Sequence, residues 1–224
     1  MRPSVPILLS FNAGYVDTAG FLALQGLFTA HVTGNFVTFG ASMVHGTSGG
    51  IAKLSALPVF CAVVVLARLL HYGLGRTGLP ILRSLLALKC VLLVAAAVLA
   101  LRFGPFADGN GALAIATGMT LVAAMALQNA VHRVHLSKSP PSTLMTGTST
   151  QIMLDVADLI HGLPPDKARE IKARLVPLVA AVAAFALGCG MAAGCFLFGG
   201  MWCFAVPPLV ALCTFASAAG EVPA

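Results

Sequence analysis

The sequence predicts an all-α membrane protein: a polytopic bundle of about six transmembrane helices, built as two inverted three-helix repeats that each carry a short half helix. Composition is the first reason, since 58% of the 224 residues are hydrophobic and only 9% are charged, whereas about a quarter of a soluble domain is charged. Long apolar runs recur along the whole chain. Lysine and arginine residues gather at alternate ends of these runs, as they do in membrane proteins.

Six apolar runs are long enough to cross about 30 Å of hydrocarbon at about 1.5 Å per residue. The predicted spans are residues 5–28, 51–74, 79–101, 111–131, 173–198 and 201–218. Two further segments, 32–44 and 144–160, are apolar but short, and we expect them to form the half helices. We treat residues 1–224 as a single membrane domain, with one repeat at about 5–103 and the other at about 109–218.

Positive charge predicts the orientation, because cytoplasmic loops carry an excess of lysine and arginine. With the N-terminus inside, ten of the 13 lysine and arginine residues lie on the cytoplasmic side. Lys53 and Arg102 lie outside, and Lys89 lies within the third run. Both termini are therefore expected in the cytoplasm. The basic residues do not cluster with aromatic residues on one face, so the expected partner is the lipid bilayer and not nucleic acid.

The two halves share a sequence pattern, in which each motif of the first half has a counterpart in the second. The matched motifs are Ala23-Leu24-Gln25 with Ala126-Leu127-Gln128, Thr33-Gly34-Asn35 with Thr146-Gly147-Thr148, and Pro58 with Pro177. Because each half contributes three spans, an odd number, the second half must be inverted relative to the first. Many secondary transporters have such repeats, with interrupted helices at the midplane. The alternative is chance similarity between low-complexity apolar segments.

Two charges fall inside predicted spans, where burial in lipid costs at least about 2.5–3.5 kcal/mol. Asp17 and Lys89 lie roughly 18 and 15 Å from the cytoplasmic ends of their helices at about 1.5 Å per residue. They form either a buried charge pair, which would remove both uncompensated charges, or Asp17 is a proton or cation site. Gln25 and Gln128 either line the same space or bond to neighbouring helices.

The two Thr-Gly motifs are the most specific local feature. Glycine permits close approach of the backbone, and threonine and asparagine cap helix starts that can bind polar or anionic groups. We expect the motifs to enter from opposite faces and to meet near the midplane, with Gly34 and Gly147 within about 15 Å, half the hydrocarbon thickness. The alternative is that they cap short surface helices. The candidate substrate or ion site comprises Asp17, Gln25, Thr33, Gly34, Asn35, Gln128, Thr146, Gly147 and Thr148.

The stretch Gly14-Tyr15-Val16-Asp17, followed by Phe21, Phe28 and His31-Val32-Thr33-Gly34-Asn35-Phe36, resembles the YoaK family of bacterial membrane proteins. The similarity runs the whole length, including the Thr-Gly-Thr motif of the second half. The resemblance implies a multi-pass protein of a family sometimes regarded as small-molecule transporters, with no settled substrate.

Together these features favour a secondary transporter of an unidentified small molecule in the bacterial inner membrane. A passive channel and a non-transporting scaffold or membrane enzyme are the alternatives. We expect that the protein is not an enzyme. Ser48 lies in a Gly-Thr-Ser-Gly sequence, but no histidine follows His161, so the last span cannot supply a general base for this serine. We expect no metal or other cofactor, since His132 and His135 lack further ligands. A homo-oligomer is compatible with the sequence.

Overall fold

The computed structural model describes residues 4–220, and these residues are helical throughout apart from turns and loops, which confirms the all-α class. The first half contains α1 (Val5–Ala23), the short 3-10 helix η1 (Val32–Gly34), α2 (Asn35–His45), α3 (Gly50–Gly75) and α4 (Ile81–Phe103). The second half contains α5 (Ala112–His135), α6 (Met145–His161), α7 (Pro165–Gly199), the 3-10 helix η2 (Gly200–Ala205) and α8 (Val206–Gly220).

Within the described range, four segments are long and apolar enough to cross a membrane: α3, α4, α5 and the stretch Pro165–Ala218 that holds α7, η2 and α8. Their outward surfaces are apolar as well. Val65 on α3 is 58% exposed, and Leu197 and Phe198 on α7 are 76% and 90% exposed. Large exposed apolar surfaces of this kind are rare on soluble monomers. The molecule is therefore a helical, membrane-like protein.

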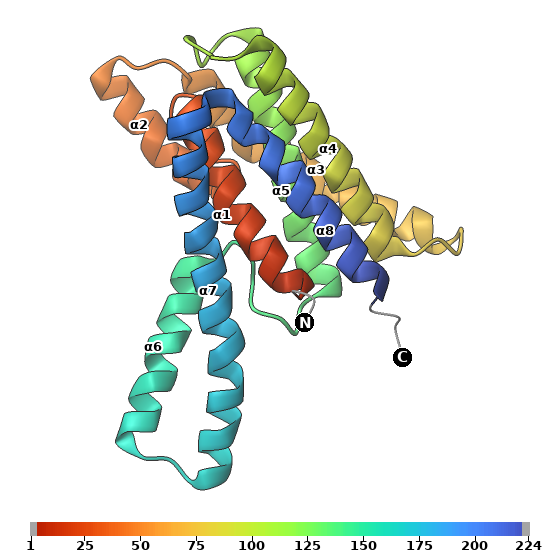
Figure 1. Ribbon diagram of the computed structural model, residues 1–224, viewed down its shortest axis with the longest axis vertical. Coiled ribbons are helices and arrows are strands. Elements are labelled where there is room, and N and C mark those ends of the chain that lie inside the picture. The colour runs from red at the N-terminus through yellow and green to blue at the C-terminus, as the bar shows by residue number, and fades with distance from the viewer. Residues whose placement is uncertain (1–3, 221–224) are drawn as a thin grey trace.

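Helix α1 lies in the middle of the bundle and packs against α7, α8 and α5 (Figure 1). It is not among the four apolar candidates, and it carries the polar residues Asn12 and Asp17. Both are buried by neighbouring helices. The crossing with α7 depends on two glycines. A Cβ at Gly14 would lie 2.1 Å from the Phe185 carbonyl oxygen, and a Cβ at Gly188 would lie 2.1 Å from that of Phe11. Small residues of this kind let helix backbones approach closely.

The first predicted span extends beyond the observed end of α1. Helix α1 stops at Ala23 and not at residue 28, because Gln25 and Gly26 adopt left-handed backbone angles, with φ of 55° and 82°. These angles turn the chain back toward the bundle. A non-glycine residue there costs about 1–2 kcal/mol, so contacts of the returning loop must offset this cost.

The fifth predicted span begins too late, since α7 starts at Pro165, eight residues before the predicted start. Pro165 occupies the first turn, where no amide donor is required, and Asp166 follows it near the positive end of the helix dipole. The first turns of α7, which carry many charged residues, are thus helical although they are not apolar. Together with α6 they form a hairpin that extends beyond the rest of the bundle (Figure 1). Arg174 on α7 pairs with the buried Asp155 on α6 and joins the two helices.

Candidate functional site

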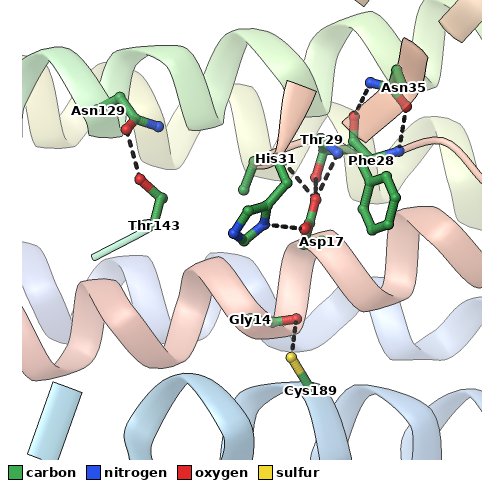
Figure 2. A network of polar contacts seen from close by, with 10 residues as sticks. Gly14, Asp17, Phe28, Thr29, His31, Asn35, Asn129, Thr143 and Cys189 are labelled. Atoms are coloured by element: carbon green, nitrogen blue, oxygen red, sulfur yellow. Dashed lines mark hydrogen bonds and ion pairs between the residues drawn. The ribbon is translucent and has the colours of Figure 1, made fainter. Parts of the chain in front are cut away.

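The carboxylate of Asp17 binds the loop that follows its own helix. One oxygen, Oδ1, accepts hydrogen bonds from the main-chain amides of Thr29 and Ala30, each at 2.7 Å. The other, Oδ2, lies 2.7 Å from Nδ1 of His31 (Figure 2). The side chain of Asp17 is 6% exposed. A buried carboxylate therefore holds residues 29–31 against the body of α1, six residues before the end of that helix.

Asn35 closes the same loop from its other end. Its Oδ1 accepts a hydrogen bond from the amide of Phe28, and its Nδ2 donates to the carbonyl oxygen of Phe28, both at 2.8 Å. Figure 2 shows this reciprocal pair beside the Asp17 cluster. An amide side chain can satisfy one donor and one acceptor of the backbone at once. Asn35 thus fixes the loop at the point where α2 begins.

A groove of about 470 Å³ lies beside this loop, between α1 and α7. Its walls are mainly aromatic. The rings of Phe21 and Phe28 lie 4.9 Å apart, and those of His31 and Phe185 lie 5.5 Å apart, edge to face. The lining residues are Asp17, Thr18, Phe21, Phe28, His31, Gly34, Phe185 and Cys189. The groove is an apolar site with a carboxylate–imidazole pair in its wall, a composition common in small-molecule sites.

The second half contains a comparable loop after α5. The Thr143 hydroxyl donates to Oδ1 of Asn129 at 2.7 Å, and Nε2 of Gln128 donates to Oγ of Ser142 at 3.0 Å. Asn129 lies six residues before the end of α5, just as Asp17 lies six residues before the end of α1. Both loops therefore turn back along the preceding helix by about 9 Å, at about 1.5 Å per residue.

His31 and Thr143 bring the two loops together. The hydrogen bond with Asp17 is the main reason that the pKa of His31 is raised, and a main-chain hydrogen bond with Thr143 raises it further. Figure 2 shows the Asn129–Thr143 pair on the side of His31 away from the Phe28–Asn35 pair. The imidazole thus lies where a loop of one half meets a loop of the other.

The predicted pairing of Asp17 with Lys89 is wrong. The partner of Asp17 is His31, a loop residue that returns to the helix. Lys89 on α4 is 1% exposed, and its Nζ has no hydrogen-bonding partner among the described residues. The prediction used depth along straight helices, and depth alone does not determine which helix faces are opposed.

The two glutamines do not line one space. Gln25 is exposed in the loop after α1, where its Nε2 donates to the carbonyl oxygen of Phe106. Gln128 is fully buried inside α5, where its Nε2 also donates to the carbonyl oxygen of Leu9. The sequence match between Ala23-Leu24-Gln25 and Ala126-Leu127-Gln128 therefore joins positions that are not equivalent in the fold.

Of the two Thr-Gly motifs, only the first contributes to the groove, through Gly34. Thr33, Thr146 and Gly147 are exposed. Thr148 is buried, and its hydroxyl donates to the carbonyl oxygen of Leu144 within its own helix. Thr146 lines a separate pocket on α6, and neither that pocket nor the groove beside Asp17 includes threonines of both motifs. The separation of Gly34 and Gly147 stays a prediction.

Sequence reasoning missed the residues that tie each loop to the helix before it, namely Thr29, His31, Asn129 and Thr143. The available signal was a histidine directly before Val-Thr-Gly-Asn and three residues after Phe28. The pairing of His31 with Asp17 could not be inferred, because the apolar run predicts a first helix that continues to residue 28. The early end of α1 moves His31 back beside Asp17.

A family model matches residues 5–217, which is nearly the whole chain. The chain belongs to the DUF1275 family. The description of that family is "Protein of unknown function (DUF1275)", so membership supplies no substrate or activity. No curated protein and no solved structure matches the chain. The features of the chain that bear on its function are therefore the Asp17 loop and its counterpart after α5.

Proposed function

We propose that this chain is a secondary transporter of a small molecule in the bacterial inner membrane. One observation carries the proposal: the loops after α1 and α5 both return into the bundle, and one of them is held by a buried carboxylate. Irregular backbone at membrane depth is tolerated only where it is buried in protein or lines a cavity. A buried ionisable residue in such a place is by default a candidate for a substrate or proton pathway.

The proposal includes six spans, α1, α3, α4, α5, α7 and α8, in two inverted halves. The packing partners support this arrangement, because the main helix contacts correspond when α1, α2, α3 and α4 are matched with α5, α6, α7 and α8. Helix α1 packs along α7 as α5 packs along α3, and α1 contacts α8 as α5 contacts α4. The short helices follow the same pattern, with α2 on α3 and α6 on α7. Helix α4 packs on α8 across the two halves.

The two halves also have comparable grooves. The first lies between α1, α7 and the loop that carries His31. The second has a volume of about 370 Å³, lies mainly between α3 and α5, and includes Asn129 and Leu144 beside the second loop. In inverted-repeat transporters, rocking of one half against the other exposes a site first to one side and then to the other. Paired grooves beside two returning loops suit such a motion.

The Asp17–His31 pair is the element that we assign to coupling. A carboxylate and an imidazole at 2.7 Å can hold or release a proton as their surroundings change. Breaking the pair would remove one of the three bonds between the loop and Asp17, and the amides of Thr29 and Ala30 would keep the other two. A change of protonation would thus change how His31 is held in the wall of the groove. The resemblance to the YoaK family stays a prediction beside this assignment.

Flux measurements in cells test the proposal. Cells with and without the protein are given a panel of labelled metabolites and organic ions, with the proton gradient intact or collapsed. We expect protein-dependent flux of at least one compound, with loss of that flux when the gradient is collapsed. The Asp17→Asn variant should lower the flux at least tenfold, since a carboxylate needed for coupling is neutral.

Asp158→Asn is the matched control, because Asp158 is an exposed aspartate on α6. It should transport as the wild type does. Flux that survives both gradient collapse and Asp17→Asn would instead support a passive channel. Identical uptake and efflux with and without the protein, across the panel, would contradict transport.

A further inference from the structure

We infer that the groove beside Asp17 binds an organic cation, and that this cation and the proton of His31 compete for the Asp17 carboxylate. The inference rests on the proposed function and names the substrate class of the same site. It predicts an exchange in which cation binding expels a proton.

The walls of the groove favour a cation over an anion or a neutral polar molecule. Among the described lining residues, Asp17 is the one carboxylate, and Phe21, Phe28 and Phe185 supply aromatic surface. Cations are attracted to the faces of aromatic rings, and aromatic cages are a common way to bind quaternary ammonium groups. The volume of about 470 Å³ falls within the roughly 300–1,000 Å³ of small-molecule sites.

One oxygen of Asp17 can exchange its partner for a ligand, whereas the other is bonded to two main-chain amides. Oδ1 accepts the amides of Thr29 and Ala30 and is also 3.4 Å from the Thr29 hydroxyl. Within residues 4–220, Oδ2 has one partner, the imidazole of His31 at 2.7 Å. The His31 side chain is 37% exposed, so it has room to move away from Oδ2. A cation in the groove would then replace the imidazolium while the loop amides kept their bonds.

The exchange balances in charge and atoms. With the groove empty, protonated His31 pairs with the Asp17 carboxylate, and the pair is neutral. When the cation binds to Oδ2, Nδ1 of His31 loses its partner and its proton passes to water. One positive charge enters and one leaves, so the wall of the groove stays neutral. No oxidant, reductant or covalent step is needed.

The groups that face His31 support this competition. Asp17 on α1 raises the pKa of the imidazole, the Thr143 main chain raises it further, and burial lowers it. From α7, the ring of Phe185 and the thiol of Cys189 face the same groove, and neither carries a charge. Asp17 is therefore the charged group that stabilises the protonated imidazole. When a cation binds to Asp17, this stabilisation is lost.

Calorimetric titration of the purified full chain in detergent tests the inference, with benzyltrimethylammonium as the probe. Its uncharged isostere, neopentylbenzene, is the matched ligand control, and protein-free micelles give the blank. The cation should bind at pH 8 and the isostere at least tenfold more weakly. Between the ordinary histidine pKa of about 6.5 and the raised pKa of His31, each unit by which the pH falls should weaken cation binding by up to about tenfold, since one proton competes. Titrations in two buffers with different ionisation enthalpies should report about one proton released per bound cation under those conditions.

Three variants separate the parts of the inference. Asp17→Asn should weaken cation binding more than about thirtyfold, the effect of removing one member of a buried charge pair. His31→Gln should keep cation binding but lose its pH dependence and its proton release. Phe185→Leu should weaken binding by about two- to thirtyfold through loss of a ring face. Phe103→Leu, at an exposed position on α4 outside the groove, should bind as the wild type does.

Equal affinity for the cation and its isostere would overturn the inference, as would wild-type affinity in Phe185→Leu and Asp17→Asn. If Asp17→Asn does not fold, the charge selectivity of the wild type and the Phe185→Leu result still decide. The outcome is distinguishable from that of the proposed function. Cation binding without any flux would contradict transport alone, and flux of another class of compound without cation binding would contradict this inference alone.

Discussion

At the scale of single residues, two buried side chains determine the path of the loop after α1. Asp17 holds the middle of the loop through the amides of Thr29 and Ala30, and Asn35 holds its start through both main-chain groups of Phe28. Each acts on the backbone of a segment that is not helical. Because buried main-chain groups are costly when they are unpaired, these side chains are the reason that the loop can lie inside the bundle.

Replacing Asn35 with alanine tests this role. We expect Asn35→Ala to lower the free energy of unfolding by about 1–3 kcal/mol, since it leaves a buried amide and a buried carbonyl unpaired. Thermal unfolding of the purified protein in detergent measures the change. Thr33→Ala, two residues earlier and exposed, should leave the melting temperature unchanged. Equal melting temperatures for the two variants would contradict the assignment.

The pair of Asp17 and His31 should make stability depend on pH in one direction. The pKa of His31, in the loop outside the helices, is raised mainly by Asp17, so the folded chain binds this proton more tightly than the unfolded chain does. The stabilisation is fully present below the ordinary histidine pKa of about 6.5 and is lost as the pH rises through the raised value. The difference in melting temperature between wild type and His31→Gln should therefore shrink from pH 5.5 to pH 9. A constant difference would contradict the pairing.

Sequence reasoning found part of this site. The position of Asp17 in the middle of an apolar run was enough to single it out, because an unpaired charge there is costly. The identity of its partner was not accessible in the same way. It depends on where α1 ends, and that end is determined by the left-handed backbone angles at Gln25 and Gly26. Lys89 was predicted at a depth similar to that of Asp17, whereas His31 followed the predicted end of the first span. Depth along the helices therefore pointed to Lys89 and not to His31.

At the scale of helices, the crossing of α1 and α7 requires glycine on both sides. Gly14→Ala and Gly188→Ala should each destabilise the protein by about 1–3 kcal/mol, the usual effect of overpacking, because the new methyl group would meet a carbonyl oxygen of the facing helix. Thermal unfolding in detergent measures this. Gly190→Ala on α7 is the control, since nothing lies within 4 Å of its added Cβ. Destabilisation by all three variants alike would contradict this account, because alanine favours helix more than glycine does and nothing lies near Gly190 to clash with a methyl group.

The helices themselves were largely predictable, because apolar runs of about 20 residues are distinctive. The errors lie at their ends. Helix α7 extends to Pro165 through residues with many charges, where hydropathy gives no signal but the Pro-Pro-Asp start does. Helix α8 begins at Val206, so Pro207 and Pro208 fall in its first turn, where proline is tolerated. Such boundaries follow from capping chemistry, which an apolar-run criterion does not include.

At the scale of the whole molecule, the packing pattern that relates the halves is clearer than the sequence pattern that suggested it. The structural counterpart of Asp17 is Asn129, by distance from the helix end and by contact with a returning loop. The matched glutamines do not correspond. The inverted repeat that we propose requires equivalent loop positions more than equivalent side chains, so one carboxylate and one amide can occupy corresponding places.

The halves also differ in what they present outside the bundle. Helix α6 is longer than α2, and with the first turns of α7 it forms the projecting hairpin (Figure 1). These turns carry many of the basic residues that we place on the cytoplasmic side, including Lys167, Arg169 and Lys172. The inverted arrangement therefore predicts that the turn after α2 lies outside the cell and the loop after α5 lies inside.

Tag accessibility in the full-length protein is the most direct test of this central claim. Short epitope tags are inserted singly after Thr47, between α2 and α3, and after Lys138, between α5 and α6. Antibody binding is then measured on spheroplasts before and after permeabilisation. The account predicts that the tag after Thr47 binds antibody at once and that the tag after Lys138 binds only after permeabilisation. Detection of both tags on the same side of the membrane would contradict the inverted halves.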